Sequence, residues 1–469
     1  MTAMARSRVK SPYRLQTSSD RRVCGRARWV LGAAAAWAAA VLHAQSPGGA
    51  QAPPDTQPED GAAEVAPAPE ESARVVTRFE AEIEMQRLAD EERYAEAVEI
   101  GEQLIPLTEA EFGPNSRETA AAYAALANVE RSLGEHQAAE ESYLRALAIY
   151  RDLEGSFAGV LIEPLLGLGD NYHDDGQYVN AVSAYNEART VSRRVDGLLN
   201  EGQIVMLDRM TKSFERLDQL AEAQTQQLEA LNLVARNHDI ASTEYLESLY
   251  KYGYWLRGSH RYNEEREQYF RAERIIQDAY GDESALLVRP LRERAISFRV
   301  QGNAASQGIS GLRDALAILE AQEAPDPLLM GQVLRDIGDW EVAFGRVTTD
   351  GANYRQSWRA LANVPNGEQL RREWYEGIEF VFSAPLSRRG LSNDPQAPRG
   401  RVLVRFDIDQ YGRSDNVTVI ASEPPGLKDE AVARHIRQSR FRPNIMNGEL
   451  VATRNRALDI IFRYTQDEE

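Results

Sequence analysis

Residues 165–185, LLGLGDNYHDDGQYVNAVSAY, decide the fold of this chain. The large and small apolar residues of the first half recur at i, i+3, i+4 and i+7, on one helical face: Leu165, Leu168, Gly169 and Tyr172. After a turn at Gly176 the same spacing returns at Ala181, Val182, Tyr185 and Ala188. Small residues such as Gly169 and Ala181 allow two helices to cross closely. The stretch therefore predicts a helix pair.

This pattern returns every 42 residues through the middle of the chain. One column of the repeat reads Tyr94, His136, Tyr178, Leu220, Tyr262, Ala304 and Arg346. Another reads Ala97, Ala139, Ala181 and Ala223. Glycines recur near 113 and 155, where we expect each second helix to end in the left-handed conformation. Independent columns with one period are typical of a solenoid, so we expect about seven stacked helix pairs over residues 78–362.

The arrangement Leu165-x2-Leu168-Gly169-x2-Tyr172, followed by Ala181-x3-Tyr185, resembles the tetratricopeptide repeat (TPR) family, with repeats lengthened to 42 residues. The resemblance implies a concave groove that binds an extended peptide or another protein. The groove positions that it implies are Asn128, Arg131, Asp170, His173, Lys212, Tyr250, Tyr254, Arg257, Arg292 and Arg299. Tyrosine and arginine suit the recognition of peptide backbone and carboxylate groups. The alternative is an ordinary solvated face without a ligand.

The last seventy residues have a different pattern. Residues 401–409, RVLVRFDID, alternate apolar and polar side chains and predict a strand. A second strand is expected over 417–421, a helix over 427–439, a hairpin turn at Asn447-Gly448, and a long strand over 453–464. We therefore expect a small α+β domain over 398–466, in the order β-β-α-β, with its helix packed on an antiparallel sheet.

Several of its elements resemble the C-terminal domain of TonB-family proteins. They are residues 400–409, Gly412-Arg413, residues 417–419, Ser422-x2-Pro425, Phe441-Arg442-Pro443 and Asn447-Gly448. The resemblance implies that a partner segment, such as the N-terminal segment of an outer-membrane transporter, adds a strand beside the last long strand. The pairing residues would be Thr453, Arg454, Asn455, Arg456, Ala457, Leu458, Asp459, Ile460, Ile461 and Phe462. Alternatively, this edge pairs only with itself or stays bare.

Residues 1–44 are typical of a secretory signal. Eight basic side chains precede the mostly apolar residues 29–42, which as a helix would rise about 21 Å, short of the roughly 30 Å hydrocarbon layer. Cleavage after Ala44 would release a periplasmic protein, whereas retention would leave a single inner-membrane anchor. Residues 45–77, rich in proline, alanine and acidic residues, predict a disordered tether, and 363–397 a linker between the two domains.

Composition excludes several classes of function. The 469 residues carry a net charge of −18, one cysteine and six scattered histidines. One cysteine cannot form a disulfide framework or a thiolate cluster, and an acidic chain does not favour nucleic acid. No nucleophile–base set, phosphate loop or metal-ligand spacing is visible, so we expect no enzyme, no cofactor and no metal. The predicted terminal domain is basic, with twelve Lys/Arg and eight Asp/Glu, which favours acidic partner segments.

Two functions remain open. The first is a non-enzymatic periplasmic scaffold for protein–protein interaction, with a peptide groove and a strand-adding terminal domain. The second is a TonB-type energy transducer, anchored in the inner membrane, coupled to motor proteins there and acting on outer-membrane transporters. The family resemblance implies a serine in such an anchor, and residues 29–42 contain none, which favours the scaffold.

Overall fold

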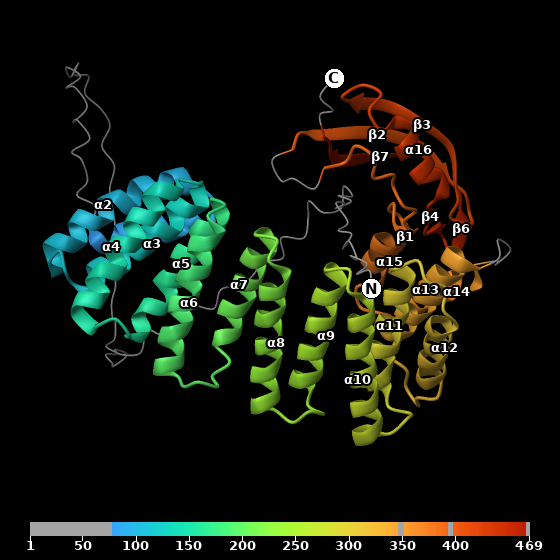
Figure 1. Ribbon diagram of the computed structural model, residues 1–469, viewed down its shortest axis with the longest axis horizontal. Helices are drawn as coiled ribbons and strands as arrows, with labels where there is room; N and C mark the ends of the chain where they lie inside the picture. The colour runs from blue at the N-terminus through green and yellow to red at the C-terminus, as the bar shows by residue number, and fades with distance from the viewer. Residues whose placement is uncertain (1–76, 346–350, 393–396, 466–469) are drawn as a thin grey trace, which may run out of the picture.

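The computed structural model describes residues 77–345, 351–392 and 397–465. Within them, seven consecutive helix pairs stack into a curved solenoid, and a small strand-rich domain follows at its C-terminal end (Figure 1). This confirms the predicted fold class. No helix of these residues is both long and apolar enough to cross a membrane. Residues 1–76, which include the predicted signal, lie outside the described residues.

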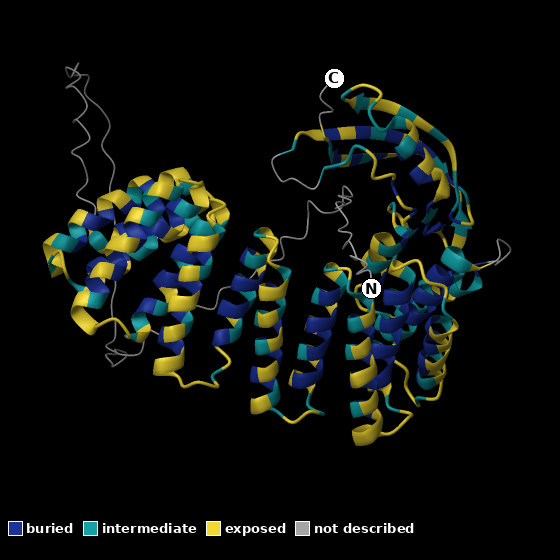
Figure 2. Ribbon diagram, in the orientation of Figure 1, coloured by how far each residue is buried: buried dark blue, intermediate teal, exposed yellow. Residues whose placement is uncertain are grey.

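Each pair contributes one helix to each of two layers. The first helices are α1 (Arg78–Asp90), α3 (Arg117–Leu133), α5 (Ile162–Asp174), α7 (Gln203–Arg216), α9 (Thr243–Gly258), α11 (Val288–Val300) and α13 (Pro327–Phe344). The second helices are α2 (Tyr94–Phe112), α4 (His136–Glu154), α6 (Tyr178–Val195), α8 (Leu220–Asn237), α10 (Tyr262–Tyr280), α12 (Ser306–Glu320) and α14 (Ala352–Ala360). The buried residues lie mainly where the two layers face each other, as the colour along the ribbon shows (Figure 2).

The turn inside each pair repeats the 42-residue period in its backbone. A residue with positive φ closes the turn in six successive pairs: Glu92, Gly134, Gly176, Asp218, His260 and Gly302. The loops after the second helices differ from the expectation. Gly113 has φ 94° and ψ 156°, which is positive φ but not the left-handed helical conformation. Only glycine adopts that region readily, which accounts for its recurrence at these loops.

In several pairs, the ring of a tyrosine from the second helix packs directly on a glycine of the first helix. Tyr185 is 1% exposed, and a Cβ on Gly169 would lie 2.4 Å from its Cε1 atom. The Tyr185 hydroxyl donates to Asp170 Oδ1 at 2.8 Å. The same contact recurs between Gly253 and Tyr269 and between Gly338 and Tyr354. The small residues of the repeat are therefore required by the rings that pack on them.

The region expected as a linker is folded in part. It contains the short helix α15 (Gly367–Tyr375) and the strand β1 (Phe380–Phe382). Tyr375 and Val381 are buried, 1% and 2% exposed, because they pack between the solenoid and the terminal domain. The burial of one side chain from the helix and one from the strand gives this segment its structure, which the scattered prolines of the sequence obscured.

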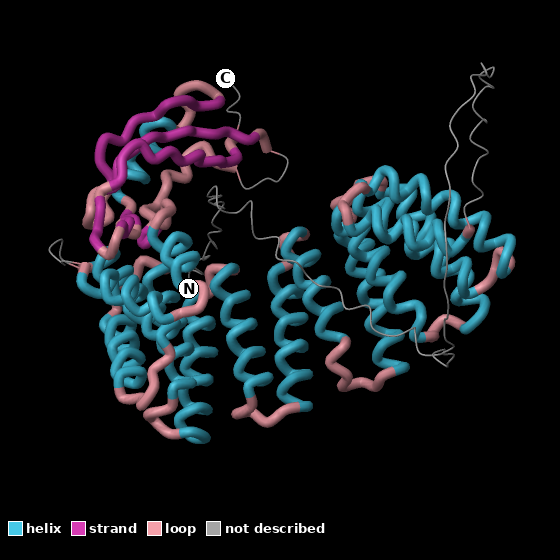
Figure 3. The backbone as a smooth tube through the Cα atoms, turned by 180° about the vertical axis from the view of Figure 1, so that it is seen from behind, coloured by secondary structure: helices cyan, strands magenta, loops and turns pink. Residues whose placement is uncertain are grey.

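The terminal domain is a three-stranded antiparallel sheet covered by one helix (Figure 3). The strand order is β3 (Ser414–Glu423), β2 (Arg399–Ile408), β7 (Thr453–Arg463), and α16 (Asp429–Gln438) packs its Val432 and Ile436 on the sheet. The β-β-α-β order is as expected. Three shorter strands are added, namely β4 (Arg440–Phe441), β5 (Asn444–Met446) and β6 (Glu449–Val451). Asn447 and Gly448, both with positive φ, form the β5–β6 turn.

Gly169→Ala should destabilise the protein by about 1–3 kcal/mol, because its methyl group overpacks against Tyr185. Replacing glycine by alanine inside a helix normally stabilises the helix by up to about 1 kcal/mol. Gly258→Ala is the matched control, since a Cβ there meets no atom within 4 Å. Urea unfolding measures both. Equal stability of the two variants would contradict the interlocked helix pair.

Candidate interaction site

The strand β7 forms one edge of the sheet. It pairs with β2 alone among the strands, with Val402 opposite Ile460 and Leu403 opposite Asp459. In an antiparallel ladder the backbone N–H and C=O of one residue point to the same side, and the side alternates along the strand. Tyr464 N donates to Pro398 O at 3.1 Å, so the backbone groups of Arg463 point away from β2. By the same alternation, so do those of Ile461, Asp459 and Ala457.

Both ends of this outer edge are closed by the chain itself. At the far end, Ser392 N donates to Arg463 O at 3.0 Å and Thr465 N to Gly390 O at 3.3 Å. We call residues 390–392 the strap. At the near end, Asn455 has φ 56° and its N–H donates to Asp407 Oδ1 at 2.8 Å, which interrupts the ladder. Within the described residues, the edge is therefore open only from 457 to 461.

The ten residues predicted for strand pairing all lie on β7, but they fall into different classes. Leu458, Ile460 and Phe462 are 2–5% exposed, and their backbone groups face β2. Those of Ala457, Asp459 and Ile461 face outward. Thr453, Arg454 and Asn455 lie at or before the interruption, and Arg456, just after it, pairs with Phe406 of β2. Asp459 Oδ2 pairs with Arg401 Nη2 at 2.7 Å, while its Oδ1 is shielded and has no hydrogen-bond partner among the described residues.

The predicted groove residues all lie on first helices, and most bond to a neighbouring repeat. Arg131 pairs with Asp174 at 2.8 Å, Asp170 with Arg209 at 3.0 Å, and His173 Nδ1 lies 2.9 Å from Ser213 Oγ. Asn128 Oδ1 accepts from the Tyr143 hydroxyl at 2.6 Å. Charges on this face therefore connect successive helix pairs rather than face open solvent alone.

Two of the predicted groove residues are buried, which corrects the expectation. Tyr250 is 4% exposed beneath the guanidinium of Arg289, which lies 4.2 Å from its ring centroid. Arg292 is 7% exposed and bonds Asp336 Oδ2 at 2.8 Å. Both side chains face a neighbouring helix. The exposed surface of each first helix is narrower than the set of positions that the repeat pattern assigned to the groove. Arg299 is also occupied, donating to Val381 O at 2.7 Å.

Lys212 and Tyr254 remain exposed on the first-helix face. Near Tyr254, Arg257 forms the centre of a polar cluster. Its guanidinium bonds Glu265 Oε1 at 2.5 Å and Glu293 Oε2 at 2.8 Å and lies 5.6 Å from the Tyr254 ring centroid. The part of Tyr254 that neighbouring side chains cover is enough to raise its pKa, and the carboxylate of Glu293 adds to the rise, so this hydroxyl stays protonated and can donate.

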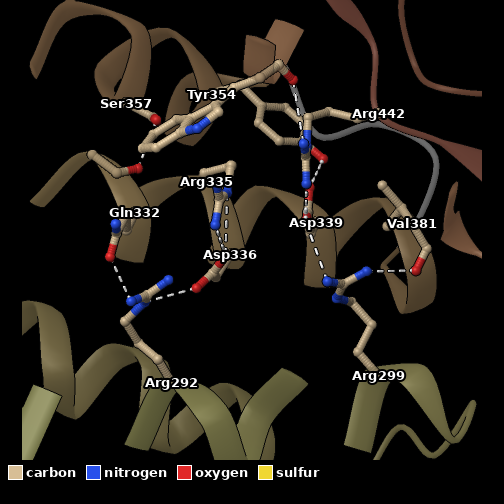
Figure 4. A network of polar contacts seen from close by, with 12 residues as sticks. Arg292, Arg299, Gln332, Arg335, Asp336, Asp339, Tyr354, Ser357, Val381 and Arg442 are labelled. Atoms are coloured by element: carbon tan, nitrogen blue, oxygen red, sulfur yellow. Dashed lines mark hydrogen bonds and ion pairs between the residues drawn. The ribbon is translucent and has the colours of Figure 1, made fainter. Parts of the chain in front are cut away.

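A buried ion pair fixes the terminal domain to the solenoid (Figure 4). Arg442 follows β4 and is 8% exposed, and Asp339 of α13 is fully buried. The two form a bidentate pair, with Arg442 Nε 2.9 Å from Asp339 Oδ1 and Nη2 2.7 Å from Oδ2. The Tyr354 hydroxyl also donates to Oδ1 at 2.9 Å, and Arg299 lies 3.4 Å from Oδ2. We call this cluster the latch.

The latch holds Asp339 in its ionised form. Burial by itself would raise the pKa of Asp339, but the guanidiniums of Arg442 and Arg299 outweigh it, and the pKa lies well below its usual value. A second buried carboxylate beside it, Asp336, has its pKa lowered for the same reason by Arg292 and Arg335. Paired buried charges with good geometry resist separation, since either partner alone would be buried without compensation. The terminal domain therefore has one fixed orientation on the last repeats.

Sequence reasoning did not identify the latch. Arg442 and Asp339 are 103 residues apart, and no periodicity relates them. The signal that was available is Arg442 in the Phe441-Arg442-Pro443 element, an arginine between apolar residues beside a short strand. Among the described residues, no group of three or more His, Cys, Asp or Glu side chains is arranged to hold a metal ion.

Comparisons with known proteins identify two domain families in the chain. Residues 88–152 match the tetratricopeptide repeat family, and residues 396–464 match the family described as Gram-negative bacterial TonB protein C-terminal. Protein TonB of Salmonella typhimurium is 32% identical over 92 residues, which is 18% of this chain and 36% of that protein. The chain thus spans about a third of the length of the curated relative that it matches.

Solved TPR structures also resemble the solenoid. A Podosopora anserina kinesin-light-chain structure with nearly identical TPR-like repeats is 17% identical, covering 43% of this chain and 96% of its own, with a TM-score of 0.37. The C-terminal part of a TPR repeat-containing protein from Cytophaga hutchinsonii is 13% identical, covering 61% and 96%, with a TM-score of 0.37. Both domain families of this chain are typical of protein interaction modules, and the TonB-like one is typical of the Gram-negative envelope.

Asp339→Asn should destabilise the protein by about 3–5 kcal/mol, because it leaves Arg442 buried without its counter-charge. Glu368→Gln is the control, since its pair with Arg372 is exposed and contributes about 0–1 kcal/mol. Urea unfolding followed by tryptophan fluorescence measures both. A loss no larger for Asp339→Asn than for the control would contradict a stabilising latch.

The same pair predicts a pH dependence. The pKa of Asp339 in the folded protein lies below its value of about 3.9 in the unfolded chain. The stability that Asp339 contributes is therefore fully present above about pH 3.9, and it is lost as the pH falls through the pKa of the folded state. The difference in unfolding free energy between wild type and Asp339→Asn should therefore stay constant from pH 8 to about pH 5. A difference that already shrinks between pH 7 and pH 5 would contradict this.

Proposed function

We propose that this protein is a non-enzymatic interaction scaffold whose terminal domain captures an extended partner segment by strand addition to β7. The observation that supports this most directly is the outer edge from 457 to 461. There, three residues direct N–H and C=O groups away from the sheet, and no backbone of the described residues pairs with them. Such an edge is a template for another strand.

The side chains beside the open edge define what kind of strand fits. Asp459 and Ile461 lie on the face of the sheet opposite α16, and Ile461 is 43% exposed. The Asp459 side chain is 35% exposed and paired with Arg401, so a polar side chain on the incoming strand suits this position. An apolar side chain at the next position on the same face would cover Ile461. Backbone bonds would supply affinity, and these alternate side chains selectivity.

The proposed location is the periplasm, and an outer-membrane transporter segment is a suitable partner. The basic and apolar composition of residues 1–44 and the TonB-like domain support this together. The alternative, an energy transducer, needs residues 29–42 to remain as an anchor. It shares the β7 edge and differs in the anchor, so processing of the N-terminus separates the two.

N-terminal sequencing of the protein purified from the cell envelope should give Gln45 as the first residue. The expected cleavage follows Ala44, after the short apolar stretch. A mature chain that still begins before residue 29 and fractionates with the inner membrane would instead favour the energy transducer.

Ala457→Pro should abolish strand addition. Ala457 is exposed and its N–H points outward, so proline removes a donor to the partner without removing a bond to β2. Leaving the partner carbonyl unpaired costs about 1–3 kcal/mol. Ala457→Val, which keeps the N–H, is the matched control. Ile460→Pro would not test strand addition by itself, because the Ile460 N–H faces β2 and the side chain is buried, so this variant would also disrupt the domain.

The measurement is affinity purification from envelope extract, with quantitative mass spectrometry of the proteins retained by wild type and by each variant. Circular dichroism should show the same helicity in all three. Proteins that are retained by wild type and Ala457→Val and lost from Ala457→Pro are strand-addition partners. An identical set of retained proteins in all three samples would contradict the proposed function.

A further inference from the structure

The near end of the β7 edge is attached to the segment that follows the solenoid, and the sheet extends from there over earlier helix pairs (Figure 1). At its near end, Arg456 Nη2 donates to Glu376 O at 3.0 Å, directly after α15. The latch between Arg442 and Asp339 lies at this same end of the domain, on α13. The open edge therefore starts at the seventh helix pair.

The far end of the edge lies toward the fifth helix pair. The strap, residues 390–392, covers that end. The neighbours of the partly exposed His260 ring in the α9–α10 turn, and then the positive charge of Arg388, lower the pKa of His260. Between the two ends, Phe382 of β1 lies against the α11–α12 turn, where a Cβ on Gly302 would be 3.3 Å from its Cε2 atom. The strand β1 thus lies against the turn of the sixth pair.

The dimensions agree with this path. From 456 to 463 the strand rises about 23 Å, at roughly 3.3 Å per residue. Packed helices lie about 8–10 Å apart and α13 packs on α11, so the strand is long enough to pass beyond the seventh pair. In Figure 1 the sheet extends from above α13 across the ends of α11, α10 and α9, with β7 nearer to the helices than β2.

The surroundings of the edge carry excess positive charge. Arg388, Arg389 and Arg454 are exposed, and none of them forms an ion pair with a carboxylate of the described residues. The guanidinium of Arg463 donates through Nη1 to Ala397 O at 2.8 Å. On the solenoid side, the turn residues His260, Gln301 and Ala304 are exposed. A negatively charged chain would neutralise this excess.

We propose that a segment added to the β7 edge also contacts the α9–α10 and α11–α12 turns, so that the solenoid and the terminal domain bind a single extended, acidic polypeptide. This inference rests on the proposed strand addition and extends it to a two-sided site. The β7 edge supplies backbone pairing on one side. The turn residues supply a second wall, and Arg388, Arg389 and Arg454 select acidic flanks.

Site-specific photo-crosslinking in the full-length protein tests this. The photoreactive amino acid p-benzoylphenylalanine replaces Ile461 at the edge, Ala304 at the α11–α12 turn, or Glu99 on α2 as a distant control, one at a time. Each protein is irradiated in envelope extract, and the joined peptides are identified by mass spectrometry. We expect Ile461 and Ala304 to join the same partner, at positions within about ten residues of each other in a stretch rich in Asp and Glu, and Glu99 not to join it.

Two further variants separate this inference from the strand addition on which it rests. Ala457→Pro should remove both crosslinks. Asp339→Asn should reduce the crosslink from Ala304 at least fivefold relative to that from Ile461, because the domain is no longer held over the turns. A crosslink from Ile461 with none from Ala304, or to a different protein or a basic stretch, overturns the two-sided site but leaves strand addition standing. Absence of the Ile461 crosslink overturns both.

Discussion

The bidentate pair between Arg442 and Asp339 is the contact on which the arrangement of this molecule depends. Each half can bury its own core, the solenoid between helix layers and the terminal domain between sheet and α16. A shared apolar cluster, with Tyr354 and Leu361 on the solenoid side and Ile445 of β5 on the other, joins the two halves. Within this contact two charges are removed from water together, with Tyr354 and Arg299 satisfying the remaining groups. Because an ion buried alone is so costly, the pair permits one orientation and penalises the others.

The sequence was sufficient for the elements and insufficient for their assembly. Local rules place the helix pairs: Tyr185 needs a small partner and finds Gly169, and the tight turns recur with positive φ every 42 residues. Alternation along β2 likewise identifies its buried face. By contrast, Tyr250 and Arg292 were expected on an open groove. Two neighbouring rows of residues run along each first helix, and the repeat pattern does not distinguish the row that faces solvent from the row that faces the next helix. The latch and the strap are contacts between distant segments, to which no local pattern corresponds.

The inner face of the solenoid has a further physical logic. Its charges come in pairs of opposite sign from successive repeats, such as Arg131 with Asp174, Lys251 with Asp208 and Arg292 with Asp336. A chain as acidic as this one would repel itself if its carboxylates were not matched in this way. The pairing leaves few free charges on the face, so recognition has to use the exceptions, chiefly exposed residues such as Lys212 and Tyr254 and the arginines around the sheet edge.

The strap has a kinetic consequence. Since it already occupies the carbonyl of Arg463, only three outward residues remain, and they offer at most six backbone bonds worth about 0.5–1.5 kcal/mol each before the ordering of a flexible tail is subtracted. A ligand held by so short a ladder dissociates quickly. A second contact nearby would lengthen the residence time, because it raises the effective concentration of the bound segment at the edge.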